Sequence, residues 1–148
     1  MTAAGSFDVL LFDLRGLRGA IEVSSVREVV PMPLQTPVAL APPVLRAVVP
    51  VRGHALPLLD IGPYLSPARE RRRDPAAPGP RRREDVAIVF EGHVPSEPGP
   101  VRAALAVDRV LRVATFDEGH ARPAPSSPAS FVTAVLPDAD GPALLVDA

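Results

Sequence analysis

The residues of this sequence that could take part in chemistry are acids, histidines and arginines. General acid–base catalysis needs two carboxylates, or a histidine and a carboxylate, held in one cleft. No spacing in the sequence marks such a pair, and acids at strand ends and turns are ordinarily solvated. The sequence therefore does not predict an enzyme. The candidate acids are Glu28, Asp60, Asp108, Asp117 and Glu118.

Metal and cofactor sites are equally unsupported by the residue types present. His54, His93 and His120 each follow a glycine and lack a ligand spacing such as H-E-x-x-H. The absence of cysteine excludes a zinc–thiolate site, an iron–sulfur cluster and a cysteine nucleophile. The absence of lysine excludes Schiff-base chemistry and a P-loop lysine. We expect neither a metal nor a cofactor.

Arginine is the basic residue of this sequence, with 16 copies against 17 acids and a net charge of −1. The triplets at 71–73 and 81–83 could contact phosphates. They alternate with acids, and no aromatic residue lies between them to stack on bases. This pattern favours a solvated loop. A small β-barrel that binds nucleic acid through this loop, and an enzyme with an unrecognised acidic site, remain alternatives from other classes.

The elements that position these residues are predicted to be short strands. Prolines number 20 in 148 residues and recur too often for long helices, while 47% hydrophobic residues exclude disorder throughout. Apolar runs spaced by roughly ten residues favour antiparallel barrels or a sandwich over alternating strands and helices. We expect about ten strands. The runs cover residues 7–14, 20–23, 44–51, 55–59, 86–90, 101–107, 109–115, 131–136 and 143–146.

A charged segment at 66–85 divides the predicted strands into two groups. It holds seven arginines, four acids, four prolines and no large apolar side chain, so it is predicted to be an exposed loop. We expect a single domain over 1–148, with one barrel region at 7–65 and a second at 86–148. Residues 24–30 are predicted to form one helical turn, capped by a serine and ended by the proline that follows.

No targeting or membrane segment is evident. The first residues lack a basic region followed by an apolar run. The most apolar stretch, 38–51, is interrupted by three prolines and is too short to cross a bilayer. We expect a cytoplasmic protein without direct membrane insertion.

Two stretches stand out from this background. Arg52-Gly53 lies at the tip of a predicted hairpin between two apolar strands, and a guanidinium there suits a carboxylate on a partner. A plain hairpin arginine is the alternative. The second stretch, ALAVDRVLRV at 104–113, is an apolar strand, an Asp-Arg break and another apolar strand.

Taken together and in order, these stretches resemble the CheW-like domain family. The resemblance covers nearly the whole chain outside 66–85. It begins with a V-x-E-V segment and a proline-containing stretch, continues through R-G-x-x-x-P-x-x-D and V-D-x-V, and ends with DGPALLVD at 140–147. The matching residues are Val26, Glu28, Val29, Arg52, Gly53, Pro57, Asp60, Val107, Asp108, Val110 and Val113.

The resemblance implies a mainly β fold of two intertwined, SH3-like, five-stranded barrels. It also implies a non-catalytic adaptor that couples methyl-accepting chemoreceptors to a CheA-type histidine kinase in a cytoplasmic signalling array. By motif position, Glu28 and Arg52 are the expected polar contacts to the receptor. Val26 and Val107 are the expected apolar lining of the same site, in a groove between the barrels.

The sequence departs from the family pattern at several positions. Ala47 and Ala104 stand where the pattern has glycine, and Pro50 stands where it has asparagine. Because proline removes a backbone donor, we expect its strand to be an edge strand or bulged. The last predicted strand reaches almost to Ala148, so we expect the family's C-terminal helix to be absent. A divergent accessory paralogue that binds receptor but not kinase, as in the Frz chemosensory system, is the alternative function.

Overall fold

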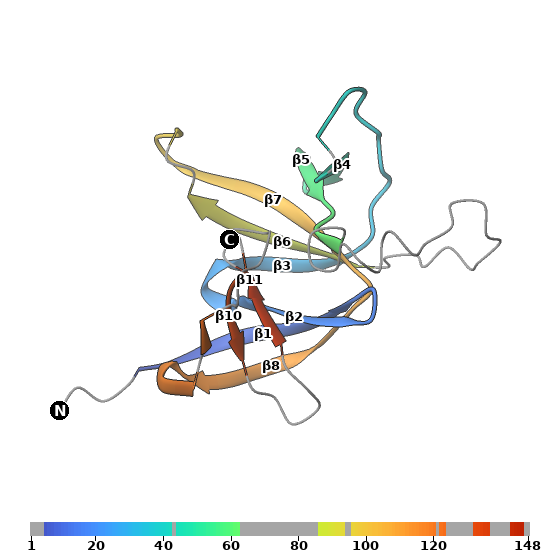
Figure 1. The fold of residues 1–148 in the computed structure, drawn as a ribbon. Coiled ribbons are helices and arrows are strands. Elements are labelled where there is room, and N and C mark those ends of the chain that lie inside the picture. The colour runs from blue at the N-terminus through green and yellow to red at the C-terminus, as the bar shows by residue number, and fades with distance from the viewer. Residues whose placement is uncertain are drawn as a thin grey trace.

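The chain folds into eleven strands and two single 3-10 turns within its described residues (Figure 1). The computed structural model describes residues 5–42, 44–62, 86–93, 96–120, 122–123, 132–136 and 143–146. The predicted loop at 66–85 lies outside them. Among the residues described, no helix is long and apolar enough to cross a membrane.

The strands form two sheets, which we call sheet A and sheet B. Sheet A has the order β8-β1-β2-β11-β10-β9, and sheet B has the order β3-β6-β7-β5-β4. The strands of sheet A are β1 (Ser6–Leu14), β2 (Leu17–Glu22), β8 (Arg109–Asp117), β9 (Arg122–Pro123), β10 (Val132–Leu136) and β11 (Ala143–Val146). The strands of sheet B are β3 (Val26–Pro31), β4 (Leu45–Val51), β5 (His54–Leu59), β6 (Val86–His93) and β7 (Pro100–Val107).

The two sheets do not follow the two halves of the chain. Residues 7–65 supply two strands to sheet A and three to sheet B, and the later half supplies strands to both as well. This differs from the expected division into one barrel region before the charged segment and one after it. The difference arises because four pairings join strands from opposite halves: β1 with β8 and β3 with β6 are antiparallel, and β2 with β11 and β5 with β7 are parallel. Sequence-local hairpins alone would have kept the halves apart.

The segment predicted as a helical turn is mostly a strand. The 3-10 turn η1 covers Val23–Ser25 without a side-chain cap, and β3 then begins at Val26. The prediction of a capped turn over 24–30 is therefore wrong. The valines that follow the serines are β-branched and suit an extended backbone. Pairing with β6 supplies the backbone hydrogen bonds that a helix would have needed to form within itself.

Three apolar clusters explain why the strands are apolar on both faces. In β1, Leu10, Phe12 and Leu14 face a cluster shared with β6 and β7, so this cluster lies between the sheets. The alternate residues Val9 and Leu11 face a second cluster, within sheet A. A third cluster, built largely from small residues such as Ala87 and Ala104, fills the concave side of sheet B. A strand that is buried on both faces does not show the alternation of polar and apolar residues seen in a half-buried strand.

Sheet B curls until its two edges approach each other. Strand β4 is an edge strand with a register shift between Leu45 and Ala47, as Pro50 predicted. The chain leaving β3 then pairs with the outer side of β4, because Thr36 and Val48 exchange two backbone hydrogen bonds of 2.9 Å. The sheet is thereby closed across β3 and β4, which lie at opposite ends of its strand order.

Candidate functional site

The site begins at the turn between β4 and β5. Arg52 has φ 49° and Gly53 has φ 78°, so both central residues are left-handed, as in type I′ hairpin turns. Glycine accepts this conformation freely, whereas arginine bears a cost of about 1 kcal/mol. The turn therefore holds an arginine in a backbone conformation that asparagine, aspartate or glycine adopts more readily.

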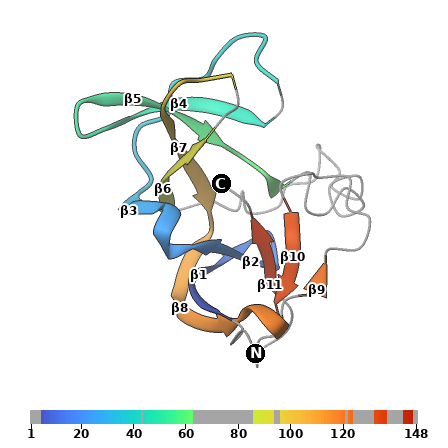
Figure 2. The same ribbon diagram turned by 90° about the vertical axis from the view of Figure 1, so that its left-hand side faces the viewer.

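The side chain of Arg52 reaches across to Glu28 on β3. Its Nε donates to both carboxylate oxygens of Glu28 at 2.9 Å. The arginine side chain is 80% exposed and the glutamate side chain 23% exposed. The pair joins the two edges of sheet B, and Figure 2 shows the β4–β5 hairpin and β3 on the same side of the molecule. The structure thus brings together the two predicted polar residues.

The two predicted apolar residues lie deeper. Val26 is half-buried at the start of β3 and packs on the cluster between the sheets. Val107 belongs to that cluster and has 0% exposure. Both valines therefore belong to the layer between the sheets, and in this conformation Val26 alone of the two offers surface to a partner. Val107 can therefore affect binding only through its packing in the layer between the sheets.

A second group of charges adjoins Glu28 and has no counterpart among the residues predicted from sequence. Arg27 contacts Glu91 on β6 through its Nε. Arg102 on β7 lies directly opposite Glu91, with its Nε 3.9 Å from the same carboxylate. A register shift between Val26 and Glu28 makes Arg27 the extra residue of a β-bulge, which can redirect a side chain. The sequence holds no signal for this group, because it depends on cross-strand register.

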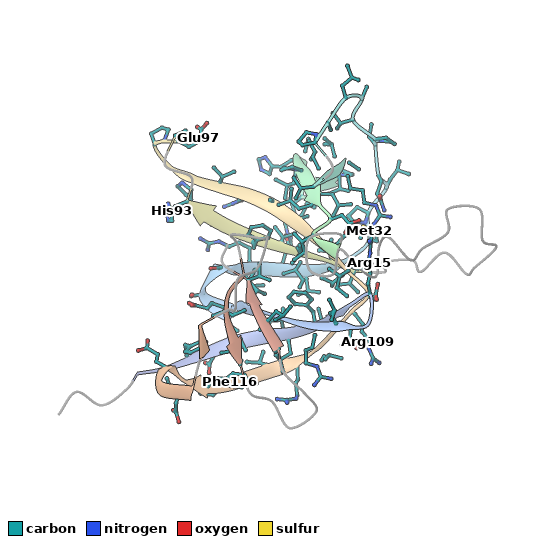
Figure 3. The ribbon with its side chains drawn as sticks, viewed as in Figure 1. Arg15, Met32, His93, Glu97, Arg109 and Phe116 are labelled. Atoms are coloured by element: carbon teal, nitrogen blue, oxygen red, sulfur yellow. The ribbon has the colours of Figure 1, made fainter. Side chains whose placement is uncertain are left out.

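Two of the candidate acids have a structural role at the boundary between the sheets. Arg15, in the β1–β2 turn, donates from Nη2 to Asp60 Oδ2 at 2.8 Å and from its backbone nitrogen to Asp108 Oδ2 at 2.9 Å. Asp60 also accepts from the backbone nitrogen of Gly62 at 3.0 Å. Figure 3 shows Arg15 where the two groups of strands meet. Asp60 and Asp108 are thus ligands of one arginine that connects sheet A to the ends of β5 and β7.

The remaining candidates are dispersed. Asp117 and Glu118 are exposed at the end of β8, and His54 and His93 are exposed at strand ends in sheet B. Over the described ranges, no three His, Asp or Glu side chains gather in a way that could hold a metal ion. The arrangement is suited to protein contact: an exposed ion pair and neighbouring arginines on the closed edge of a small sheet.

These features define a small all-β interaction domain of two sheets with an apolar layer between them. The family model for the CheW-like domain matches residues 8–148, and the chain belongs to that family. Its fold is similar to that of the scaffolding protein TtCheW from Thermoanaerobacter tengcongensis, with a TM-score of 0.70 and 18% identity over 97% of this chain and 90% of that one. The comparison with curated proteins gave no match.

The expected fold class is confirmed by these findings. The mainly β architecture with two sheet subdomains is that of the CheW fold. One detail differs, because sheet A has six strands in place of five. The additional strand is the two-residue β9, which pairs with β10 alone.

Proposed function

We propose that this protein is a non-catalytic chemosensory adaptor that couples methyl-accepting chemoreceptors to a CheA-type histidine kinase. Membership of the CheW-like family supports this function. The observation that carries the proposal is the Arg52–Glu28 pair, which presents an exposed guanidinium at a left-handed turn and fixes its direction. What suits this arginine to a partner is its exposure, because most of the guanidinium remains open to solvent.

In this proposal the receptor contacts the surface around the pair. Arg52 uses Nε to hold Glu28, and within the described part of the chain its terminal nitrogens make no hydrogen bond. These donors are available to a carboxylate or carbonyl of the receptor. Glu28 fixes the direction of the guanidinium, and half-buried Val26, two residues before Glu28, is the proposed apolar contact.

An adaptor also needs a surface for its second partner. The segment between β3 and β4 carries Leu34 at 82% and Leu40 at 105% exposure, and Leu40 has φ 58°. Two exposed leucines, one of them in a strained backbone conformation, are the composition expected of a contact surface. We assign this surface to the kinase regulatory domain.

The test is binding to two partners in parallel: a receptor cytoplasmic-tip fragment and the kinase regulatory domain from the same source. Arg52→Ala is expected to weaken receptor binding and to leave kinase binding unchanged. Leu34→Ser with Leu40→Ser is expected to do the reverse. Arg109→Ala is the matched control, because Arg109 is 70% exposed and pairs with Asp13 at 2.8 Å on sheet A.

The outcomes separate the candidate functions. Binding of both partners with these selective losses supports the adaptor. Binding of the receptor alone supports a divergent paralogue that occupies receptors without recruiting kinase and so restricts the pathway. Binding of neither at high micromolar concentration overturns both.

A charge exchange distinguishes a contact made by Arg52 from a merely structural ion pair. The double variant Glu28→Arg/Arg52→Glu can restore the pair within the chain while reversing the charge shown to the receptor. Weak binding by this folded variant supports direct contact. Restored binding would show that the pair acts only by closing sheet B.

A further inference from the structure

The surface beside the Arg52–Glu28 pair carries a row of alternating charges across three strands and a turn. Arg102 on β7, Glu91 on β6 and Arg27 on β3 are joined through the Glu91 carboxylate. Glu28 is the next residue along β3 and joins Arg52. Three guanidinium groups thus accompany two carboxylates, and the row has a net charge of +1.

The three arginines are far more exposed than the acids that hold them. Arg27, Arg52 and Arg102 have side chains that are 55%, 80% and 57% exposed, whereas Glu91 is 13% exposed. Each arginine contacts its acid through Nε. Over the described ranges, their terminal nitrogens make no hydrogen bond. The acids therefore act as fixed anchors, and the donors of the row face solvent.

The geometry of β3 brings this row together. The bulge at Arg27 lets consecutive residues serve different partners, since Arg27 meets Glu91 and Glu28 meets Arg52. Without the extra residue, one strand would place consecutive side chains on opposite faces. Bulges are retained where they direct a side chain toward a site.

We infer that the partner of this surface presents carboxylate side chains that bind Arg27 and Arg102 next to the Arg52 site. The inference rests on the proposed function and deepens it, because it assigns an acidic character to the receptor segment that docks here. Planar guanidinium groups with two outward nitrogens favour paired binding of carboxylates. The net positive charge of the row also favours approach of an acidic partner.

The experiment compares three proteins with the receptor tip fragment at low and high salt: wild type, Arg27→Gln/Arg102→Gln and the control Arg109→Gln. The double variant is expected to bind about tenfold more weakly at low salt, the size expected for two partly exposed charge pairs. Its affinity is also expected to depend less on salt than that of the wild type, because exposed charges are screened. The control is expected to bind as the wild type does.

A triple variant guards against a folding artefact. The double variant leaves Glu91 without its two arginines, so Arg27→Gln/Glu91→Gln/Arg102→Gln replaces that acid with its neutral analogue. The same tenfold loss in this variant, with an unchanged thermal unfolding curve, supports the inference. Wild-type affinity in both variants would overturn the inference and leave the proposed function standing. Failure of the wild type to bind the fragment would overturn the proposed function and, with it, the inference.

Discussion

Two turns of this molecule have the same sequence and the same backbone but hold their arginines in opposite surroundings. Arg15-Gly16 joins β1 to β2 with φ values of 53° and 79°, and Arg52-Gly53 joins β4 to β5 with 49° and 78°. The Arg15 side chain is 18% exposed and the Arg52 side chain 80% exposed. The turn type therefore does not decide the role of its arginine; what decides it is whether another sheet lies over the turn.

The buried turn ties the sheets together, and the exposed one presents a donor to solvent. Asp60, directly after β5 of sheet B, and Asp108, between β7 of sheet B and β8 of sheet A, both accept hydrogen bonds from Arg15. Glu28 reaches Arg52 from the same sheet and leaves most of the guanidinium uncovered. A partly buried ion pair is costly to break because its partner is left desolvated, whereas an exposed pair contributes little.

The largest effect is expected from Arg15→Ala. Removing this guanidinium leaves Asp60 with a side chain that is only 12% exposed, and the free energy of unfolding should fall by about 3 kcal/mol. Chemical denaturation measures this loss of free energy, and Arg52→Ala is the variant for comparison. Equal losses for the two variants would remove the distinction between the turns.

A smaller loss is expected from Gly62→Ala. A Cβ at this position would lie 2.6 Å from Nε and 2.7 Å from Cδ of Arg15. The arginine would have to move away from Asp60, at a cost of about 2 kcal/mol. If this variant is as stable as the wild type, Arg15 has room to shift and is not a fixed connection between the sheets.

Gly53→Ala is expected to cost about 1 kcal/mol. No atom lies within 4 Å of a Cβ built there, so the cost comes from the φ of 78° alone. Thermal unfolding should show a lower midpoint than in the wild type. A loss as large as that of Gly62→Ala would mean that the exposed turn is packed more tightly than its surroundings indicate.

The smallest effect on stability, within about 0.5 kcal/mol, is expected from Arg52→Asn. Asparagine favours the left-handed turn conformation, which offsets the loss of the exposed ion pair. Receptor binding should nevertheless weaken, because the guanidinium is gone. A parallel measurement of unfolding and receptor affinity separates the two effects; a variant that loses stability but keeps its affinity would reverse the roles assigned to the turns.

The sequence was sufficient for the fold class, and it named two polar residues that the structure brings together. Hairpins with Gly turns, short apolar runs and the R-G-x-x-x-P-x-x-D motif predicted a CheW-like β fold, which is confirmed. Glu28 and Arg52 lie in contact. Their role in receptor binding stays a prediction.

The register of the strands and their long-range pairing could not be predicted from the sequence. The parallel contact of β2 with β11 joins the two ends of the chain, and no local pattern encodes it. The Arg27–Glu91–Arg102 group depends on a bulge and on which strand neighbours β3. One available signal was missed: the second Arg-Gly turn, at Arg15, repeats the first and could have directed attention to the acids that bind it.

The interleaved strand order also sets the sequence of events when the chain is made. All five strands of sheet B have left the ribosome once Val107 emerges. Sheet A must wait for β11, because β2 has β1 on one side and β11 on the other. The surface that carries Arg52 can thus assemble during synthesis while β2 still has an open edge, and that edge is a site for chaperones or for mispairing until residues 143–146 arrive.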